Sequence, residues 1–251
     1  MADYNVLKAR KKTATATRAA GDELAKGRKV RRRAASERKR NGTEREERDE
    51  AVRQRIIRAA AEIYREWGYE RAGMADIARR LGMTAPALYW YFRSKEDILV
   101  AFLEHTVTDL IRFVPGLLHS TEPKQRLWEF IYAYTLWQLQ QQELSAAYER
   151  IYALGHLRNS LPKKQRQRIT SLEREFYGMC RGLIAALPGR ERKAAAAPVA
   201  FAIIGMVEHL ISWFSPNGPM SVKEVATLYA DLALAMAAAT PVAAKTPRKA
   251  A

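Results

Sequence analysis

Apolar residues recur at three- and four-residue spacing along almost the whole chain from Glu44 onward, and this periodicity constrains the fold more than any other feature. No stretch shows the sustained alternation of period two that a half-buried strand requires. The sequence therefore predicts an all-α protein with about nine helices and no internal repeat.

Glycine, proline and capping residues divide this periodic region into separate helices. Gly68 is expected to end the first long helix, and Thr84 and Ser94 are expected to cap two of the helices that follow. Proline and glycine separate the remaining periodic stretches. After the first helix, the expected helices cover about 74–81, 85–92, 95–113, 123–142, 144–155, 162–187, 195–214 and 221–239.

Two of these helices are short, follow a long helix and are joined by the tight turn Leu81-Gly82-Met83-Thr84. This is the geometry of a helix-turn-helix DNA-binding unit. Residues 56–99 closely resemble the DNA-binding domain of the tetracycline-repressor (TetR) family. The resemblance lies in Gly68-Tyr69, Met74-Ala75-Asp76-Ile77-Ala78, Leu81-Gly82-Met83-Thr84, Ala87-Leu88-Tyr89-Trp90-Tyr91-Phe92 and Ser94-Lys95-Glu96-Asp97-Ile98-Leu99. It implies a homodimeric transcriptional regulator that binds a near-palindromic double-stranded DNA operator and is released by a ligand, with repression as the default.

The matched positions imply specific roles on DNA. Residues at the start of the second short helix face the base edges, whereas Tyr89 and Lys95 match positions that usually hold phosphates. Trp90 is either an exposed aromatic that contacts DNA or a partly buried structural residue. The Tyr91 hydroxyl can contact phosphate only if its ring points outward. The residues expected to contact DNA are Thr84, Ala85, Pro86, Tyr89, Trp90, Tyr91, Lys95 and Arg55.

Apolar residues of the same unit have a structural role, and one position departs from the family pattern. Ile77, Leu81, Leu88 and Phe92 are expected to form the small core that fixes the crossing of the two short helices. Gly73 stands where the family usually has a Thr or Ser that touches phosphate, so one contact is missing. Ala85, Pro86 and Trp90 leave the second short helix with few side chains that can donate hydrogen bonds to bases. This favours recognition of an A·T-rich site through apolar contacts and DNA shape.

The positive charge lies mainly outside this unit. Of the net charge of +16, residues 1–43 carry +10 and residues 240–251 carry +3, while residues 44–103 are neutral. The first segment is expected to be a disordered arm that attracts DNA of any sequence. Its basic clusters are Arg31, Arg32, Arg33, Arg38, Lys39 and Arg40. The predicted organisation is an arm (1–43), a DNA-binding domain (44–100), a ligand-binding and dimerisation domain (101–239) and a disordered basic tail (240–251).

The larger domain is rich in aromatic residues at helical spacing, which suits a ligand cavity and a plain core equally. Residues 202–232 resemble the C-terminal part of TetR members that sense acyl-coenzyme A thioesters, which implies a small hydrophobic effector of that class. His209 and Trp213 are expected on one helix face, although His209 also suits a hydrogen-bonded core position. The candidate ligand residues are Trp137, Tyr152, His156, His209 and Trp213.

The basic residues Arg158, Lys163, Lys164 and Arg166 suit either coenzyme A phosphates or an ordinary solvated surface. The last two expected helices are apolar over wide faces, which favours pairing with a second subunit.

Other classes of protein find less support in the sequence. No phosphate-binding loop, His-Glu metal motif or nucleophile elbow is present, so neither an enzyme, a cofactor nor a metal site is expected. No secretion signal is recognisable, and the single Cys180 fits a reducing cytoplasm. The most apolar run, 194–207, is broken by Pro198 and is expected to be too short for a membrane span. The remaining alternative is a sequence-neutral, chromosome-associated DNA-binding protein that uses its basic arm.

Overall fold

The computed structural model describes residues 43–153, 159 and 161–239, and no strand occurs among them. The expected all-α class is therefore confirmed for this part of the chain. Two compact units are present, Met1–Gln54 and Arg55–Ala251. In the first unit the described residues, 43–54, are helical; the basic arm predicted over residues 1–43 lies almost wholly outside the described residues, as does the tail over 240–251.

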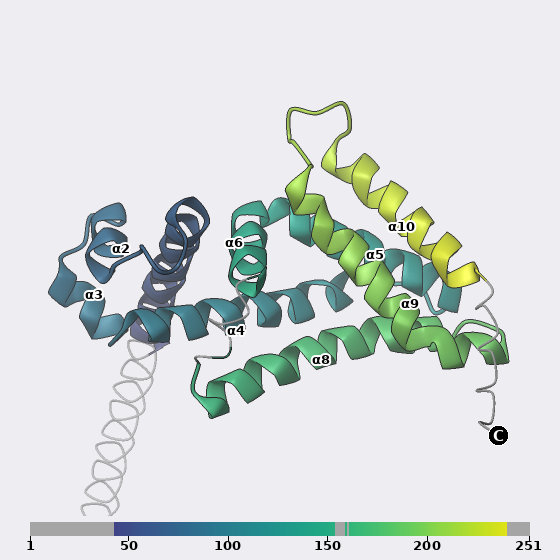
Figure 1. The fold of residues 1–251 in the computed structure, drawn as a ribbon, viewed down its shortest axis with the longest axis horizontal. Coiled ribbons are helices and arrows are strands. Elements are labelled where there is room, and N and C mark those ends of the chain that lie inside the picture. Colours follow the sequence, from purple (N-terminus) through teal and green to yellow (C-terminus); the bar gives the residue numbers. More distant parts are fainter. Residues whose placement is uncertain (1–42, 154–158, 160, 240–251) are drawn as a thin grey trace, which may run out of the picture. The chain divides into compact units, whose positions relative to one another are not determined.

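The second unit begins with three helices (Figure 1). Residues 55–67 are helical, and Gly68 ends this helix with a positive φ of 81°, as its sequence position predicts. Helices α2 (Met74–Arg80) and α3 (Ala85–Tyr91) follow. Ile77, Leu88 and Phe92 are buried as expected, whereas Leu81 is only partly buried.

A long helix, α4 (Lys95–Phe113), continues past residue 100, so the predicted domain boundary at 100/101 falls inside one element. Its N-terminal cap is Ser94, whose hydroxyl accepts a hydrogen bond from the Asp97 amide at 3.1 Å. The remaining elements are η1 (Pro115–Leu117), α5 (Pro123–Gln140), α6 (Gln142–Ala153), α8 (Lys163–Ala185), α9 (Arg190–Glu208), η2 (His209–Ser212) and α10 (Val222–Ala238).

The larger core lies among these later helices. Helix α10 packs mainly against α5, α9 against α8, and α8 against α4. The core side chains include Phe130, Trp137, Phe176, Ile203 and Tyr229, which come from four different helices. These contacts hold the elements around the cavity described below.

Helix α9 corrects two expectations from the sequence. Pro198 does not interrupt it, since the helix continues on both sides of this exposed proline. The segment Ala195–Ser212 therefore reaches the length and apolar composition of a membrane span, contrary to the expectation that it is too short. Its residues Ile203, Ile204 and Val207 are buried against the rest of the protein, as in the core helix of a folded domain.

Candidate functional site

The turn between α2 and α3 fixes the start of the second helix. Gly82 has a φ of 65°, a conformation that glycine adopts without strain. The amide of Met83 then bonds back to the carbonyl of Ala78 at 2.9 Å. Thr84 caps α3, because its hydroxyl accepts a hydrogen bond from the Ala87 amide at 3.4 Å. The turn and cap together define where α3 begins.

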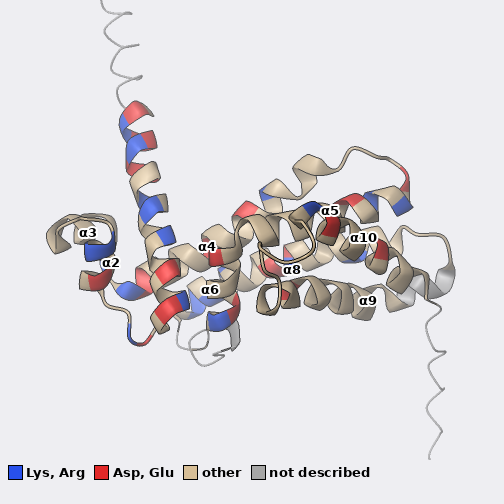
Figure 2. Cartoon of the chain, turned by 90° about the horizontal axis from the view of Figure 1, so that it is seen from above, with Lys and Arg blue, Asp and Glu red and all other residues tan. Residues whose placement is uncertain are grey.

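The outer face of α3 is aromatic and uncharged. Tyr89 is 50 % exposed and Trp90 is 63 % exposed, so both rings are available to a partner. Tyr91 is partly buried and meets the Trp90 ring edge-on at 4.6 Å between centroids. Figure 2 shows that no Lys, Arg, Asp or Glu lies on this helix. Such a surface suits recognition of DNA by apolar contact and groove shape, and this role of α3 stays a prediction.

The other residues predicted to contact DNA differ in how far their side chains are exposed. Thr84, Pro86 and Arg55 are exposed, whereas Ala85 is partly buried. Among the nearby arginines, Arg79 pairs with Asp76 at 3.0 Å and Arg80 bridges Glu62 and Glu66 at 2.9 Å each. These two arginines are therefore already partly neutralised within the domain.

Lys95 has partners inside the protein. Its ammonium group donates to the carbonyl of Tyr69 at 3.1 Å and to that of Glu70 at 3.4 Å. It also lies 4.3 Å from the centre of the Tyr69 ring. Lys95 thus ties the start of α4 to the segment that follows the first helix, and a contact with phosphate stays a prediction.

The larger domain contains a cavity of about 360 Å³, here called the central cavity. It lies among α4, α5, α6, α8, α9 and η2, and most of its lining is apolar or aromatic. Two of the predicted ligand residues, Trp137 and His209, line it. The Trp137 indole nitrogen donates to Asp109 at 2.8 Å, which fixes the orientation of its ring.

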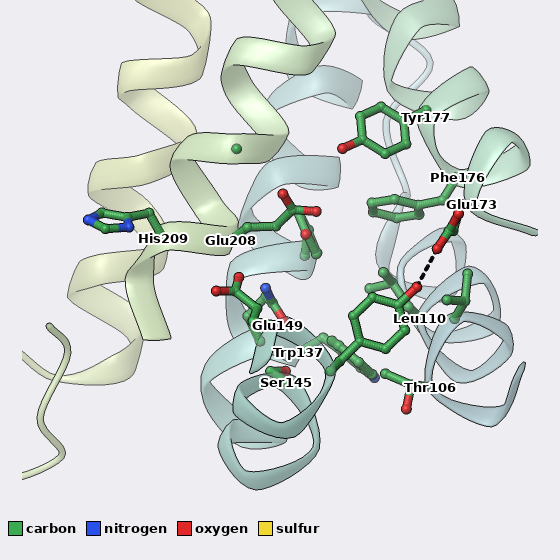
Figure 3. A pocket seen from close by; sticks show the side chains of 15 residues that line it. Thr106, Leu110, Trp137, Ser145, Glu149, Glu173, Phe176, Tyr177, Glu208 and His209 are labelled. Atoms are coloured by element: carbon green, nitrogen blue, oxygen red, sulfur yellow. Dashed lines mark hydrogen bonds between the residues drawn. The ribbon is translucent and has the colours of Figure 1, made fainter. Parts of the chain in front are cut away.

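Acidic side chains from three helices also line the central cavity. They are Glu149 on α6, Glu173 on α8 and Glu208 on α9 (Figure 3). Glu173 accepts a hydrogen bond from the Tyr148 hydroxyl at 2.6 Å. Burial raises the pKa of Glu208 to about 7, with further contributions from the charges of Glu149 and Glu173. Burial also raises the pKa of Glu149, although His209 opposes that shift.

The five predicted ligand residues are not all brought together at this cavity. His209 and Trp213 were expected to share one helix face, and this prediction is wrong. Helix α9 ends at Glu208, and a 3-10 segment follows it. Trp213 is 52 % exposed and lies against Phe214 and Tyr229 rather than lining the cavity. The His209 ring is exposed and points away from Glu208 in Figure 3. His156 and the side chain of Tyr152 lie outside the described residues.

The three glutamates were missed by the sequence analysis. They are far apart in the chain, and only the packing of α6, α8 and α9 brings them to one cavity. One signal was present: Glu208 is the only charged residue in the apolar run from Ala194 to Leu210. A lone carboxylate in such a run is rarely placed in a core without a function or a partner.

A helix-turn-helix unit followed by a larger helical domain that contains a cavity is the architecture of a helix-turn-helix transcriptional regulator. Residues 56–102 match the family described as bacterial regulatory proteins, tetR family. Residues 120–237 match the tetracyclin repressor-like C-terminal domain. The chain belongs to the TetR family.

Among curated proteins, the chain is similar to the HTH-type transcriptional activator FasR of Mycolicibacterium smegmatis, with 41 % identity over 81 residues. This match covers 32 % of the present chain and 36 % of FasR. The A-factor receptor protein of Streptomyces griseus is 45 % identical over 49 residues, which cover 20 % of the present chain and 18 % of that protein. The matched region thus spans about a third or less of these curated relatives.

Among solved structures, the TetR-family regulator PfmR from Thermus thermophilus is similar along most of its length. The identity is 26 % and the TM-score is 0.60, and the match covers 72 % of the present chain and 97 % of PfmR. AibR in complex with isovaleryl coenzyme A and operator DNA has the same fold, with a TM-score of 0.57 and 20 % identity. That match covers 73 % of the present chain and 96 % of AibR.

Proposed function

We propose that this protein is a cytoplasmic, ligand-responsive repressor that binds a palindromic operator as a homodimer. The observation that carries the proposal is the outer face of α3, where the rings of Tyr89 and Trp90 are exposed. The same chain also contains the central cavity in its larger domain. Exposed aromatics are costly in water unless a partner covers them, and base edges and sugars are suitable partners. The relative FasR is named an activator. The sign of regulation therefore differs among the relatives of this chain, and repression is proposed here rather than shown.

The homodimer is supported by an exposed apolar surface on α9 and α10. Phe201 is 61 % exposed on α9, and Leu228 and Leu232 are each more than 40 % exposed on α10. Pairing with the same surface of a second copy would cover these residues in a two-fold arrangement.

Ligand control is proposed to act through the central cavity. A ligand that binds better to a conformer in which the two recognition helices no longer match the operator shifts the population away from DNA. Helix α4 is the physical link, because it begins beside the DNA-binding helices at Lys95 and lines the cavity with Thr106, Val107 and Leu110.

The proposed effector is an acyl-coenzyme A thioester. The supporting observation is a second cavity of about 510 Å³ between α8 and α9, lined by Arg174 and Arg181. It shares Glu173 and Tyr177 with the central cavity. An acyl chain in the central cavity would place coenzyme A phosphates outside it, within reach of such arginines.

Native mass spectrometry tests the proposed function. The purified protein is expected to have the mass of two chains, and any additional mass identifies a co-purified small molecule. With one operator duplex it is expected to form a complex that contains two chains. Adding the ligand identified in this way should dissociate that complex. A protein that stays monomeric, or that coats duplexes in proportion to their length, would contradict the proposal.

A further inference from the structure

The end of the first helix is held by side chains from two later helices. Residues 65–70, here called the junction, form the last turn of this helix and the start of its connection to α2. The last carbonyls of a helix have no partner within that helix, and the partial negative charge at this end favours cations. Because the connection leads to α2 and α3, the groups that hold the junction also fix the direction of α3.

Lys95, the first residue of α4, holds one part of the junction. Its ammonium group donates to the carbonyls of Tyr69 and Glu70 and lies over the Tyr69 ring. An ammonium group has three donors, so two of them are used inside the protein. The contact with the ring adds attraction, which is stronger where water is partly excluded. Lys95 therefore binds the junction through both its donors and its charge.

Tyr69 is a buried anchor for this contact. Its side chain is 6 % exposed and meets the ring of Tyr64 in the first helix edge-on, with 5.4 Å between ring centroids. Burial and the charge of Glu96 raise the pKa of the Tyr69 hydroxyl, which stays protonated and donates to the Glu96 carboxylate. The Tyr69 carbonyl also accepts a hydrogen bond from the Ala72 amide at 3.2 Å. Releasing Lys95 from this carbonyl would therefore loosen the turn that leads to α2.

A second cation reaches the junction from the larger domain. Arg150 lies on α6, and its guanidinium donates to the carbonyl of Arg65 at 2.7 Å. An added Cβ at Gly68 would lie 3.7 Å from the same guanidinium, so the contact is close. Glu143, also on α6, lies 3.9 Å from the Arg65 guanidinium, but exposed pairs of this kind contribute little. Arg150 thus makes a charge-assisted hydrogen bond from α6 to the first helix.

We propose that Lys95 and Arg150 are positioning residues that set operator affinity through the junction, without touching DNA. This inference rests on the proposed function in that the operator is what α3 recognises. The two cations hold the carbonyls of Arg65, Tyr69 and Glu70, and the junction in turn fixes the direction in which α2 and α3 leave the first helix. An internal contact of Lys95 replaces the phosphate contact expected from its place in the sequence.

The proposal predicts a different pattern of loss from that of a phosphate contact. Two copies of α3 must match half-sites at a fixed spacing, so a change in their direction lowers the fraction of protein that fits the operator. Binding of other duplexes does not depend on this match. A lost phosphate contact would instead weaken binding to every sequence about equally and reduce the salt dependence.

Operator binding at several salt concentrations separates the two roles of Lys95. Lys95→Met keeps most of the side-chain length and removes the charge. It should weaken operator binding roughly fivefold or more, with no change in the slope of log affinity against log salt. If Lys95 held one phosphate in each of two chains, the slope would fall by about 1.8 in magnitude, and this result would overturn the proposal. Lys124→Met, which removes an exposed lysine from the first turn of α5, is the control and should bind as wild type.

A double-mutant cycle tests whether the two cations act on the same junction. Arg150→Met should weaken operator binding roughly fivefold, and Arg150→Lys, which keeps a donor for the Arg65 carbonyl, should recover most of the loss. Combining Lys95→Met with Arg150→Met should cost little more than the stronger single change, because either one already releases the junction. Losses that multiply, or an Arg150→Met protein with wild-type affinity, would overturn the proposal. Arg126→Met is the matched control, because this arginine also donates to a backbone carbonyl but within the larger domain.

Hydrogen exchange reports on the junction in the absence of DNA. The amides of Gly68 and Ala72 donate to carbonyls of the first helix and the junction, which protects them from exchange. Both amides should exchange roughly tenfold faster in Lys95→Met and Arg150→Met than in wild type, whereas amides in the middle of α5 should not change. Unchanged exchange at the junction would overturn the proposal. Melting curves by circular dichroism confirm that each variant is folded.

The proposed function and this inference fail separately. A protein without preference for any duplex loses the proposed function, while faster exchange in the variants still shows that the two cations hold the junction. A protein that binds one palindrome with the same affinity in wild type, Lys95→Met and Arg150→Met keeps the function and loses the inference.

Discussion

At the scale of single residues, Tyr89 offers a direct test of the DNA interface. Its ring is half exposed on α3, a position where the hydroxyl can reach a partner outside the protein. Tyr89→Phe should weaken operator binding roughly fivefold, about 1 kcal/mol for one lost hydrogen bond to phosphate. Fluorescence anisotropy measures the affinity. Tyr132→Phe in the larger domain is the control, and equal affinities of both variants would contradict the assignment.

Glu208 offers a second residue-scale test, through stability. Its folded-state pKa of about 7 lies above the ordinary value of 4.5, so the folded protein holds the proton more tightly. The resulting stabilisation is present below about pH 4.5 and is lost as the pH rises through about 7. Glu208→Gln mimics the protonated form and should match wild type at pH 5.

At pH 8.5 the Glu208→Gln variant should be more stable than wild type by about 1–3 kcal/mol. Urea unfolding at both pH values measures the difference in the free energy of unfolding. A difference that does not change with pH would show that Glu208 is ionised normally in the folded protein.

At the scale of elements, most helix bounds were predictable from the sequence because they depend on local signals. Ser94 caps α4 and Gly68 ends the first helix, as periodicity and capping rules indicate. The end of α9 at Glu208 was not predictable in this way, because no glycine or proline stands there to mark it. The same limit applies to the site, where packing of three helices joins glutamates that are distant in sequence.

The exposed surface of α9 gives the element-scale prediction. Phe201→Asp places a charge on the exposed apolar surface of the proposed dimer interface, where desolvating it has no compensation. The variant should sediment as a monomer at concentrations where wild type is a dimer, and its operator affinity should fall more than tenfold. Phe201→Leu should remain dimeric. A Phe201→Asp protein that still sediments as a dimer would place the interface on another surface.

At the scale of the whole molecule, charge and specificity are separate properties. The first 43 residues carry +10 of the net charge, whereas residues 44–103 are neutral. Removing residues 1–40 should therefore lower affinity for every duplex and reduce the dependence of binding on salt, because fewer counterions are released. Preference among sequences should change little. Binding isotherms at several salt concentrations measure both effects, and loss of preference with unchanged overall affinity would refute this division.

Helix α3 and its exposed aromatics are proposed to recognise one DNA sequence. The decisive measurement selects a duplex from a random library with the full-length protein and compares its affinity with that of a scrambled duplex at one salt concentration. A palindrome bound by two chains at least about 10³-fold more tightly than the scrambled duplex is expected. Equal affinities for the two duplexes would contradict it and would support the sequence-neutral alternative.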